Sequence, residues 1–180
     1  MIIATAGHVD HGKTSLIRQL TGIETDRLAE EQRRGLSINL GYAYLPRPQG
    51  VPLGFIDVPG HQRFINTMIS GISGIDMGLL VVAADDGPMP QTLEHLDVLD
   101  ILGVDQLTVV ISKIDRAGEA RLQEVRGQIQ GLLAARRWRD FAVFPVSNTE
   151  GSGVAELGSF LQQLGGALQR VRSGGGFRLS

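Results

Sequence analysis

Short apolar segments alternate with longer segments of helical periodicity along the chain. The segments expected as strands are 1–6, 53–58, 78–85, 107–115 and 141–147. They are nearly continuous apolar runs, which is the pattern of strands buried on both faces of a parallel sheet. The segments expected as helices are 13–21, 61–72, 90–102, 118–137 and 153–169. This alternation predicts an α/β fold with a mostly parallel sheet and helices on both of its faces.

One further strand is expected over 37–45, where it would pair with 51–57 through the turn PRPQG. It brings the sheet to six strands, and ligands of such sheets bind at the carboxyl ends of the strands. Residues 22–36 carry seven charges and little periodicity, and we expect a mobile loop there. The first 171 residues are expected to form one domain. Residues 172–180 are expected as a glycine-rich linker or the start of a second domain.

The composition narrows the class of protein further. The 180 residues carry a net charge of -2, so no strongly basic nucleic-acid binder is indicated. There is no cysteine, which excludes disulfides and cysteine-based metal sites. Neither a signal peptide nor a membrane-spanning run is recognisable. We therefore expect a cytoplasmic protein that does not bind membranes, and we expect a monomer.

The segment GHVDHGKT, residues 7–14, matches the phosphate-binding pattern G-x-x-x-x-G-K-[ST] between a strand and a helix. Its glycines let several backbone N–H groups point at phosphate oxygens, and the helix adds its positive end. Lys13 would reach the β and γ phosphates, and the Thr14 hydroxyl would bind Mg²⁺. The residues expected to contact the nucleotide here are Gly7, His8, Val9, Asp10, His11, Gly12, Lys13, Thr14 and Ser15.

The segment DVPGH, residues 57–61, follows the expected strand 53–58. An aspartate at a strand's carboxyl end is placed to hold Mg²⁺, which assigns Asp57 to the metal. The backbone N–H of Gly60 would contact the γ-phosphate. His61 could orient the attacking water in a GTPase-type site, which makes His61 and Lys13 the candidate catalytic residues.

The segment SKID, residues 112–115, and Ser147-Asn148 follow two further strands. An aspartate at position 115 can accept hydrogen bonds from two adjacent N–H groups of guanine, whereas adenine would oppose it with an acceptor. The stem of Lys113 can lie over the base. The base pocket is therefore expected to consist of Ser112, Lys113, Asp115, Ser147 and Asn148.

In order, GHVDHGKT, RRGLSI, DVPGH, SKID and VSN resemble the motifs of translational GTPases over essentially the whole chain. Longer stretches, such as FIDVPGHQRFINTMISGISGID (55–76), look like selenocysteine-specific elongation factors. The resemblance implies a GTP-binding (G) domain with GTP or GDP and Mg²⁺ as cofactors. It implies a switch that helps deliver selenocysteyl-tRNA to the ribosome at recoded UGA codons. Contacts with the tRNA would then be made mainly, and contacts with an mRNA hairpin only, by domains absent here.

The resemblance also assigns roles and exposes departures from the family pattern. Ser37 falls where a threonine usually meets Mg²⁺ and the γ-phosphate, so the implied metal ligands are Thr14, Ser37 and Asp57. Ser112 replaces asparagine or threonine, and one hydroxyl bonds fewer partners than an amide, which predicts weaker nucleotide binding. Asn148 stands where alanine is usual, and we expect its contact to be mainly through the backbone. No arginine finger is evident, so intrinsic hydrolysis should be slow.

The aspartate and histidines inside the phosphate loop need a separate explanation. Asp10 could brace the loop by accepting backbone N–H bonds, or help to hold a monovalent cation near the phosphates. His8 and His11 could form a thin metal site, but a surface or loop-packing role is favoured. His95, in a predicted helix, is expected to be structural or solvated.

Four functions remain distinguishable at this point. The first is the translational GTPase switch, with the γ subunit of the archaeal and eukaryotic initiation factor as its nearest rival. The others are a metallochaperone-type GTPase, a P-loop ATPase or small-molecule kinase, and a nucleotide-dependent binding module with almost no hydrolysis. The order and spacing of the motifs favour the first.

Overall fold

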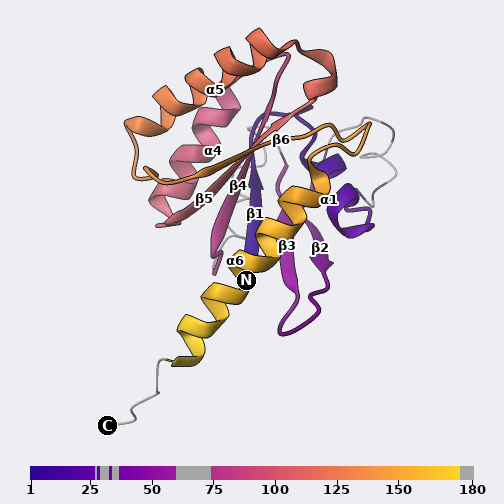
Figure 1. The fold of residues 1–180 in the computed structure, drawn as a ribbon, viewed down its shortest axis with the longest axis vertical. Coiled ribbons are helices and arrows are strands. Elements are labelled where there is room, and N and C mark those ends of the chain that lie inside the picture. The colour runs from indigo at the N-terminus through magenta and orange to yellow at the C-terminus, as the bar shows by residue number, and fades with distance from the viewer. Residues whose placement is uncertain (27, 29–32, 34–36, 60–73, 175–180) are drawn as a thin grey trace.

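The computed structural model describes residues 1–26, 28, 33, 37–59 and 74–174, with side chains described as far as residue 167. These residues form one sheet of six strands in the order β2-β3-β1-β4-β5-β6 (Figure 1). The strands are β1 (Ile2–Ala6), β2 (Gly41–Leu45), β3 (Leu53–Asp57), β4 (Met77–Ala83), β5 (Gln106–Ser112) and β6 (Ala142–Pro145). The predicted α/β class and six-stranded sheet are confirmed.

Neighbouring strands are parallel except at the β2 edge of the sheet. There β2 pairs with β3 in antiparallel register, Gly41 opposite Asp57 and Leu45 opposite Leu53, which confirms the predicted hairpin. The strand is shorter than predicted, because residues 37–40 do not join the ladder. The central strand β1 has β3 on one side and β4 on the other, so the chain order changes direction at β1, where α/β sheets bind ligands.

The helices agree with the prediction in number and order wherever the structure describes them. They are α1 (Lys13–Thr21), α4 (Pro90–Ile101), α5 (Glu119–Ala134) and α6 (Val154–Gly174), with a 3₁₀ turn η2 (Ile114–Arg116). The predicted helix 61–72 lies outside the described residues. Helix α6 extends to Gly174, so the first three residues of the expected linker are helical.

The prediction of a strand as far as residue 115 is wrong at its end. Strand β5 stops at Ser112 because Lys113 adopts a left-handed conformation with φ 56°, and the η2 turn follows at once. Non-glycine residues rarely adopt this conformation, and when they do it marks a turn. The turn moves Asp115 off the sheet, to the end where ligands bind.

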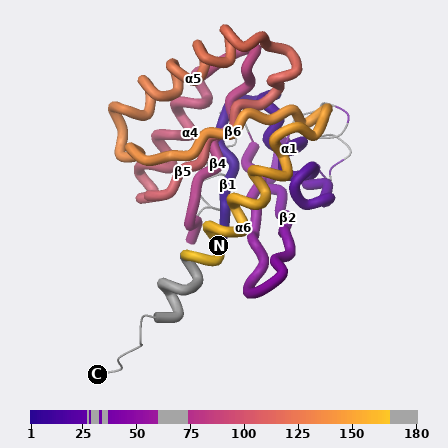
Figure 2. The backbone as a smooth tube through the Cα atoms, in the orientation of Figure 1, coloured from indigo at the N-terminus to yellow at the C-terminus, as the bar shows by residue number. Residues whose placement is uncertain are grey.

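The sheet separates two layers of helices. Side chains of α1 and α6 enter one apolar cluster with Ile3, Phe55 and Leu79, and Figures 1 and 2 show α6 running across this face. Side chains of α4 and α5 enter a second cluster on the opposite face with Leu80 and Val109. Helices on both faces explain why most side chains of the inner strands are apolar and buried.

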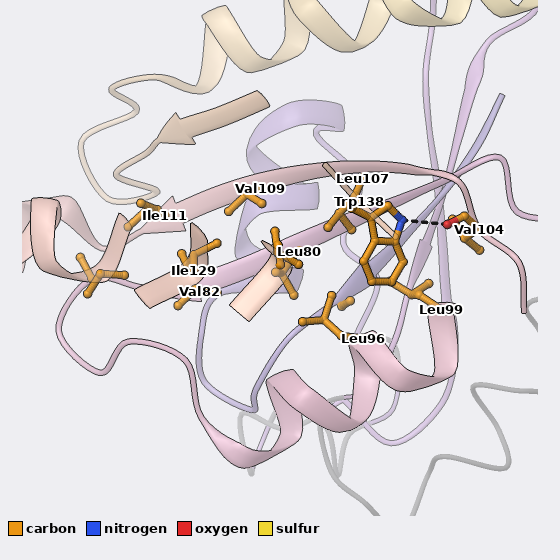
Figure 3. Packing of buried hydrophobic residues seen from close by; sticks show 14 residues of the cluster. Leu80, Val82, Leu96, Leu99, Val104, Leu107, Val109, Ile111, Ile129 and Trp138 are labelled. Carbon is orange, nitrogen blue, oxygen red and sulfur yellow. Dashed lines mark hydrogen bonds between the residues drawn. The ribbon is translucent and has the colours of Figure 1, made fainter. Parts of the chain in front are cut away.

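The chain's single tryptophan closes the second cluster. Trp138 packs beside Leu99 and Leu107, and its indole N–H donates to the carbonyl of Val104 over 2.8 Å (Figure 3). The side chain is 2% exposed, so this bond satisfies a polar group that burial would otherwise leave unpaired. Within the described part of the chain, no helix combines the length and hydrophobicity needed to cross a bilayer.

Candidate nucleotide-binding site

A cavity of about 410 Å³ lies at the carboxyl ends of β1 and β5, the end of the sheet predicted to bind a ligand. This volume is within the range of small-molecule sites. Its lining comes from the phosphate loop, the start of α1, the segment after α1 and the turn after β5. The lining residues are Val9, Asp10, Gly12, Lys13, Thr14, Ser15, Arg18, Glu24, Asp26, Ser37, Lys113 and Arg116.

The phosphate loop owes its path to glycine. Gly7 has φ 130°, and a Cβ there would lie 2.1 Å from the carbonyl oxygen of Val81, so a side chain cannot be placed. Helix α1 begins at Lys13 with no side chain capping its first turn. The first N–H groups of a helix have no partner within it, so they are free to face an anion in the cavity.

Two side chains of helix α4 hold the phosphate loop in place through hydrogen bonds. The N–H of Gly7 donates to Nδ1 of His95 over 3.0 Å, and the N–H of Val9 donates to Oε1 of Gln91 over 2.9 Å. Two N–H groups of the loop are thereby paired with side chains of α4. Burial lowers the pKa of His95 to about 3, with a smaller effect of Lys13, so the imidazole is neutral and can accept this bond. The structural role expected for His95 is confirmed, but its partner could not be predicted.

The Lys13 ammonium group is buried under the loop. Nζ donates to the carbonyl oxygens of Gly7 and His8 over 3.1 and 2.7 Å. Burial lowers its pKa to about 8, although the charge of Asp57 opposes this effect. An anionic phosphate beside Nζ would stabilise the charged form.

The three predicted metal ligands come together. The hydroxyls of Thr14 and Ser37 are 3.0 Å apart, and Asp57 accepts bonds from Thr5 (3.1 Å) and Thr25 (2.8 Å). Burial raises the pKa of Asp57, while hydrogen bonds from Thr14 and other hydroxyls oppose the shift. All of these donors are oxygens, which is the ligand chemistry that Mg²⁺ prefers, so the residues fit the metal.

Three further residues complete this oxygen-rich corner and were not predicted from the sequence. Asp26 accepts a bond from the Ser37 hydroxyl over 2.7 Å. Thr25 bonds Asp57 as described, and Thr5 both donates to Asp57 and accepts the N–H of Val58 over 2.9 Å. Asp26 and Thr25 belong to a charged loop without periodicity, so nothing in the sequence pattern marked them.

The residues predicted to recognise the base lie at or just after the ends of strands β5 and β6. The Ser147 hydroxyl donates to Oδ1 of Asp115 over 2.5 Å, and this bond lowers the pKa of Asp115 and fixes its orientation. Nζ of Lys113 is 3.8 Å from the carboxylate of Asp85 and 4.0 Å from that of Asp86, two residues that were not predicted. Asp115 and Ser147 are thus bonded to each other, and of the predicted pocket residues Lys113 lines the cavity.

Two side chains, one at the end of β5 and one after β6, form hydrogen bonds with the phosphate loop. The Ser112 hydroxyl donates to the carbonyl of His11 over 2.6 Å. Nδ2 of Asn148 donates to the carbonyl of Gly12 over 3.1 Å, and the Asn148 carbonyl accepts a bond from Gln19 over 2.8 Å. The Asn148 amide therefore reaches the loop directly, and its backbone contact with the nucleotide stays a prediction.

The loop histidines pack against each other. Their ring centroids are 5.2 Å apart in an edge-to-face arrangement, and His11 is fully buried. Burial lowers the pKa of His11 to about 4, with a smaller effect of His8. No group of three metal-binding side chains occurs among the described residues.

The predicted bracing role of Asp10 is not supported by its contacts, and the predictions for Gly60 and His61 cannot be compared with the structure. Asp10 has φ 62° and an exposed side chain, and within the described residues its carboxylate braces no backbone N–H. Gly60 and His61 lie outside the described residues.

A family model for the elongation factor Tu GTP-binding domain matches residues 1–165. The chain therefore belongs to this family, the translational GTPases, whose members bind and hydrolyse GTP.

Individual relatives refine this assignment. The chain is 52% identical to the selenocysteine-specific elongation factor of Escherichia coli (strain K12) over 164 residues, which is 91% of this chain and 27% of that protein. The crystal structure of a bacterial selenocysteine-specific elongation factor, EF-Sec, superimposes with a TM-score of 0.88 at 41% identity, over 93% of this chain and 29% of that one. The γ subunit of translation initiation factor 2 from Methanocaldococcus jannaschii is 40% identical over 81% of this chain and 41% of its own length. The chain thus spans about a quarter of the elongation factors it resembles.

Proposed function

We propose that this chain is the GTP-operated switch of a selenocysteine-specific elongation factor. The observation that carries the proposal is the hydrogen bond that Ser147 donates to Asp115; Lys113, two residues before Asp115, lines the phosphate-loop cavity. We infer that guanine selection and triphosphate binding take place in one site. The 52% identity to the Escherichia coli factor supports the selenocysteine assignment over the initiation-factor rival, whose γ subunit is 40% identical.

In the proposed mechanism, the chain's own residues position the triphosphate. The N–H groups at the start of α1 and the Lys13 ammonium would bind the phosphates, and the oxygens of Thr14, Ser37 and Asp57 would hold the metal. Mg²⁺, when bound, neutralises charge on the β and γ phosphates. Lys13 stabilises the charge that develops during cleavage. His61 is proposed to orient the attacking water, and Gly60 to contact the γ-phosphate.

We also propose that Asp10 faces a monovalent cation. Asp10 is exposed and lines the cavity, and its backbone is left-handed. GTP hydrolysis should then be faster in potassium than in choline salts of equal ionic strength. An Asp10→Asn variant should lose this preference; equal rates of the unaltered chain in both salts would remove the cation from the mechanism.

Outside this domain, we propose the ribosome as the partner that stimulates hydrolysis and selenocysteyl-tRNA as the cargo of the whole factor. Contacts with the tRNA and with an mRNA hairpin would be made mainly by segments outside these 180 residues. The domain itself is proposed to act as a monomer in the cytoplasm, with residues 172–180 joining it to the rest of the protein.

The test replaces the matching part of the Escherichia coli factor with this chain. The chimera should support selenocysteine insertion at a UGA codon of a reporter in cells that lack their own factor. The same chimera with Lys13→Ala should bind GTP weakly and should not support insertion. A chimera that accumulates and binds GTP selectively over ATP, yet leaves the UGA codon unread, would reject the selenocysteine assignment but keep the GTPase assignment.

A further inference from the structure

Two consecutive carbonyl groups of the phosphate loop are held by side chains from the base-recognition segments. His11 O accepts the Ser112 hydroxyl from the end of β5, and Gly12 O accepts Nδ2 of Asn148 from the segment after β6. The two donors are separated from the loop by 101 and 136 residues of sequence. The loop that would bind phosphate and the loops that would bind the base are therefore joined by side-chain hydrogen bonds.

The orientation of the Asn148 amide is determined by its partner. A carbonyl oxygen can only accept, so the amide nitrogen must face Gly12. This leaves Oδ1 of Asn148 enclosed without a hydrogen-bond partner, an arrangement that costs free energy. An apolar residue at this position would avoid that cost. The single bond to the loop is thus the favourable contact that the amide makes.

The backbone of Asn148 ties the same segment to α1. Gln19 donates to the Asn148 carbonyl, and α1 begins directly after the phosphate loop. The neighbouring residue Ser147 orients Asp115, the carboxylate expected to read guanine. One dipeptide therefore holds the base-reading carboxylate on one side and the phosphate loop on the other.

A bound guanine nucleotide would span the two parts that these bonds join. Its base would meet Asp115 while its phosphates meet the loop, so both ends bind well only when the two parts keep a fixed spacing. Preorganisation of this kind increases affinity, because fewer groups of the protein have to be ordered when the nucleotide binds. Losses of such contacts usually raise the dissociation rate.

We propose that Asn148, assisted by Ser112, is a positioning residue that sets how long a guanine nucleotide remains bound. This inference rests on the proposed guanine-nucleotide site and adds a determinant of residence time to it. It also predicts that nucleotide binding is weakened less than the serine at position 112 alone would suggest. The reason is that Asn148 supplies a second hydrogen bond to the loop.

The experiment measures release of a fluorescent GDP from the chain in Mg²⁺. Asn148→Ala should raise the dissociation rate about tenfold, which corresponds to losing roughly one hydrogen bond's contribution. Asn148→Asp keeps the size of the side chain but offers an oxygen to Gly12 O, so it should release GDP at least as fast. Ser112→Ala should also speed release. Gln123→Ala, on the exposed face of α5, is the control and should release GDP at the unaltered rate.

Two further readouts separate positioning from a general loss of structure. The midpoint of urea unfolding without nucleotide and the preference for GDP over ADP should stay unchanged in Asn148→Ala. Unaltered GDP release in both variants would overturn the proposal. Faster GDP release together with a lower urea midpoint in Asn148→Ala would also overturn it, because a general loss of structure would then explain the release. If the unaltered chain binds no guanine nucleotide, the proposed function itself fails, a result distinct from either of these.

Discussion

The backbone N–H of Gly7 donates to Nδ1 of His95, a residue 88 positions away on helix α4, over 3.0 Å. The donor begins the phosphate loop, and the acceptor is a buried neutral imidazole. Helix α4, which packs on one face of the sheet, thereby determines the path of the loop that follows β1.

Replacing His95 by phenylalanine should leave the buried Gly7 N–H without a partner. We expect the free energy of unfolding to fall by about 1–3 kcal/mol, as for other unsatisfied buried donors. His95→Asn keeps an acceptor near the position of Nδ1 and should recover part of this loss. Urea denaturation of the two variants measures the difference; equal stability of both would show that the hydrogen bond contributes little.

The chain should become less stable as the pH falls below about 6.5. The pKa values of His95 and His11 are lowered in the folded state to about 3 and about 4, so below pH 6.5 the unfolded chain binds more protons. Stability is therefore present above pH 6.5 and is lost on acidification, by up to about 2 kcal/mol per histidine at pH 5.

Chemical unfolding at pH 7 and pH 5 tests this acid sensitivity. The His95→Asn variant should lose less stability than the unaltered chain over the same interval, because one of the two histidines is absent. An identical loss in the variant would assign the acid sensitivity to other groups.

Nucleotide binding should take up a proton above about pH 8. Burial lowers the pKa of Lys13 to about 8, and a phosphate beside its ammonium would raise it again. Above pH 8 the free chain holds Lys13 partly neutral and the complex holds it charged, so GTP affinity should fall as the pH rises. Calorimetry at pH 8.5 in buffers of different ionisation enthalpy measures the uptake, and Lys13→Met should abolish it.

Replacing Asp115 by asparagine should change the base that is bound. The carboxylate accepts from two adjacent N–H groups of guanine, whereas an amide pairs better with the carbonyl of xanthine. We expect GTP affinity to fall by two orders of magnitude or more and XTP affinity to rise. Competition binding with GTP, XTP and ATP measures this, and an unchanged preference would show that SKID does not read the base.

The sequence predicted most of the fold because its strands are apolar on both faces and its helices lie between them. It failed at β5, where the left-handed Lys113 ends the strand, because no local pattern marks that conformation. The phosphate loop, Asp57 and Asp115 could be predicted, since each follows a strand as a recognisable motif. His95 and Gln91 could not, because their role depends on how α4 packs against β1.

The side chain of Asn148 makes another contact that could not be predicted from the sequence. Its motif position suggested a backbone contact, whereas its reach to Gly12 depends on how close the segments after β1 and β6 come in the folded chain. Sequence motifs predict which residue types meet a ligand, but the hydrogen bonds that hold those residues in place arise from tertiary packing.

The Thr5 hydroxyl has a consequence that reaches beyond the metal corner. It donates to Asp57 and at the same time accepts the N–H of Val58, the next residue. A ligand that draws the Asp57 carboxylate toward itself must therefore lengthen one of these bonds or move the start of the segment at Val58 with it. The single hydroxyl of Thr5 thus couples the position of the Asp57 carboxylate to the backbone of the chain that leaves β3.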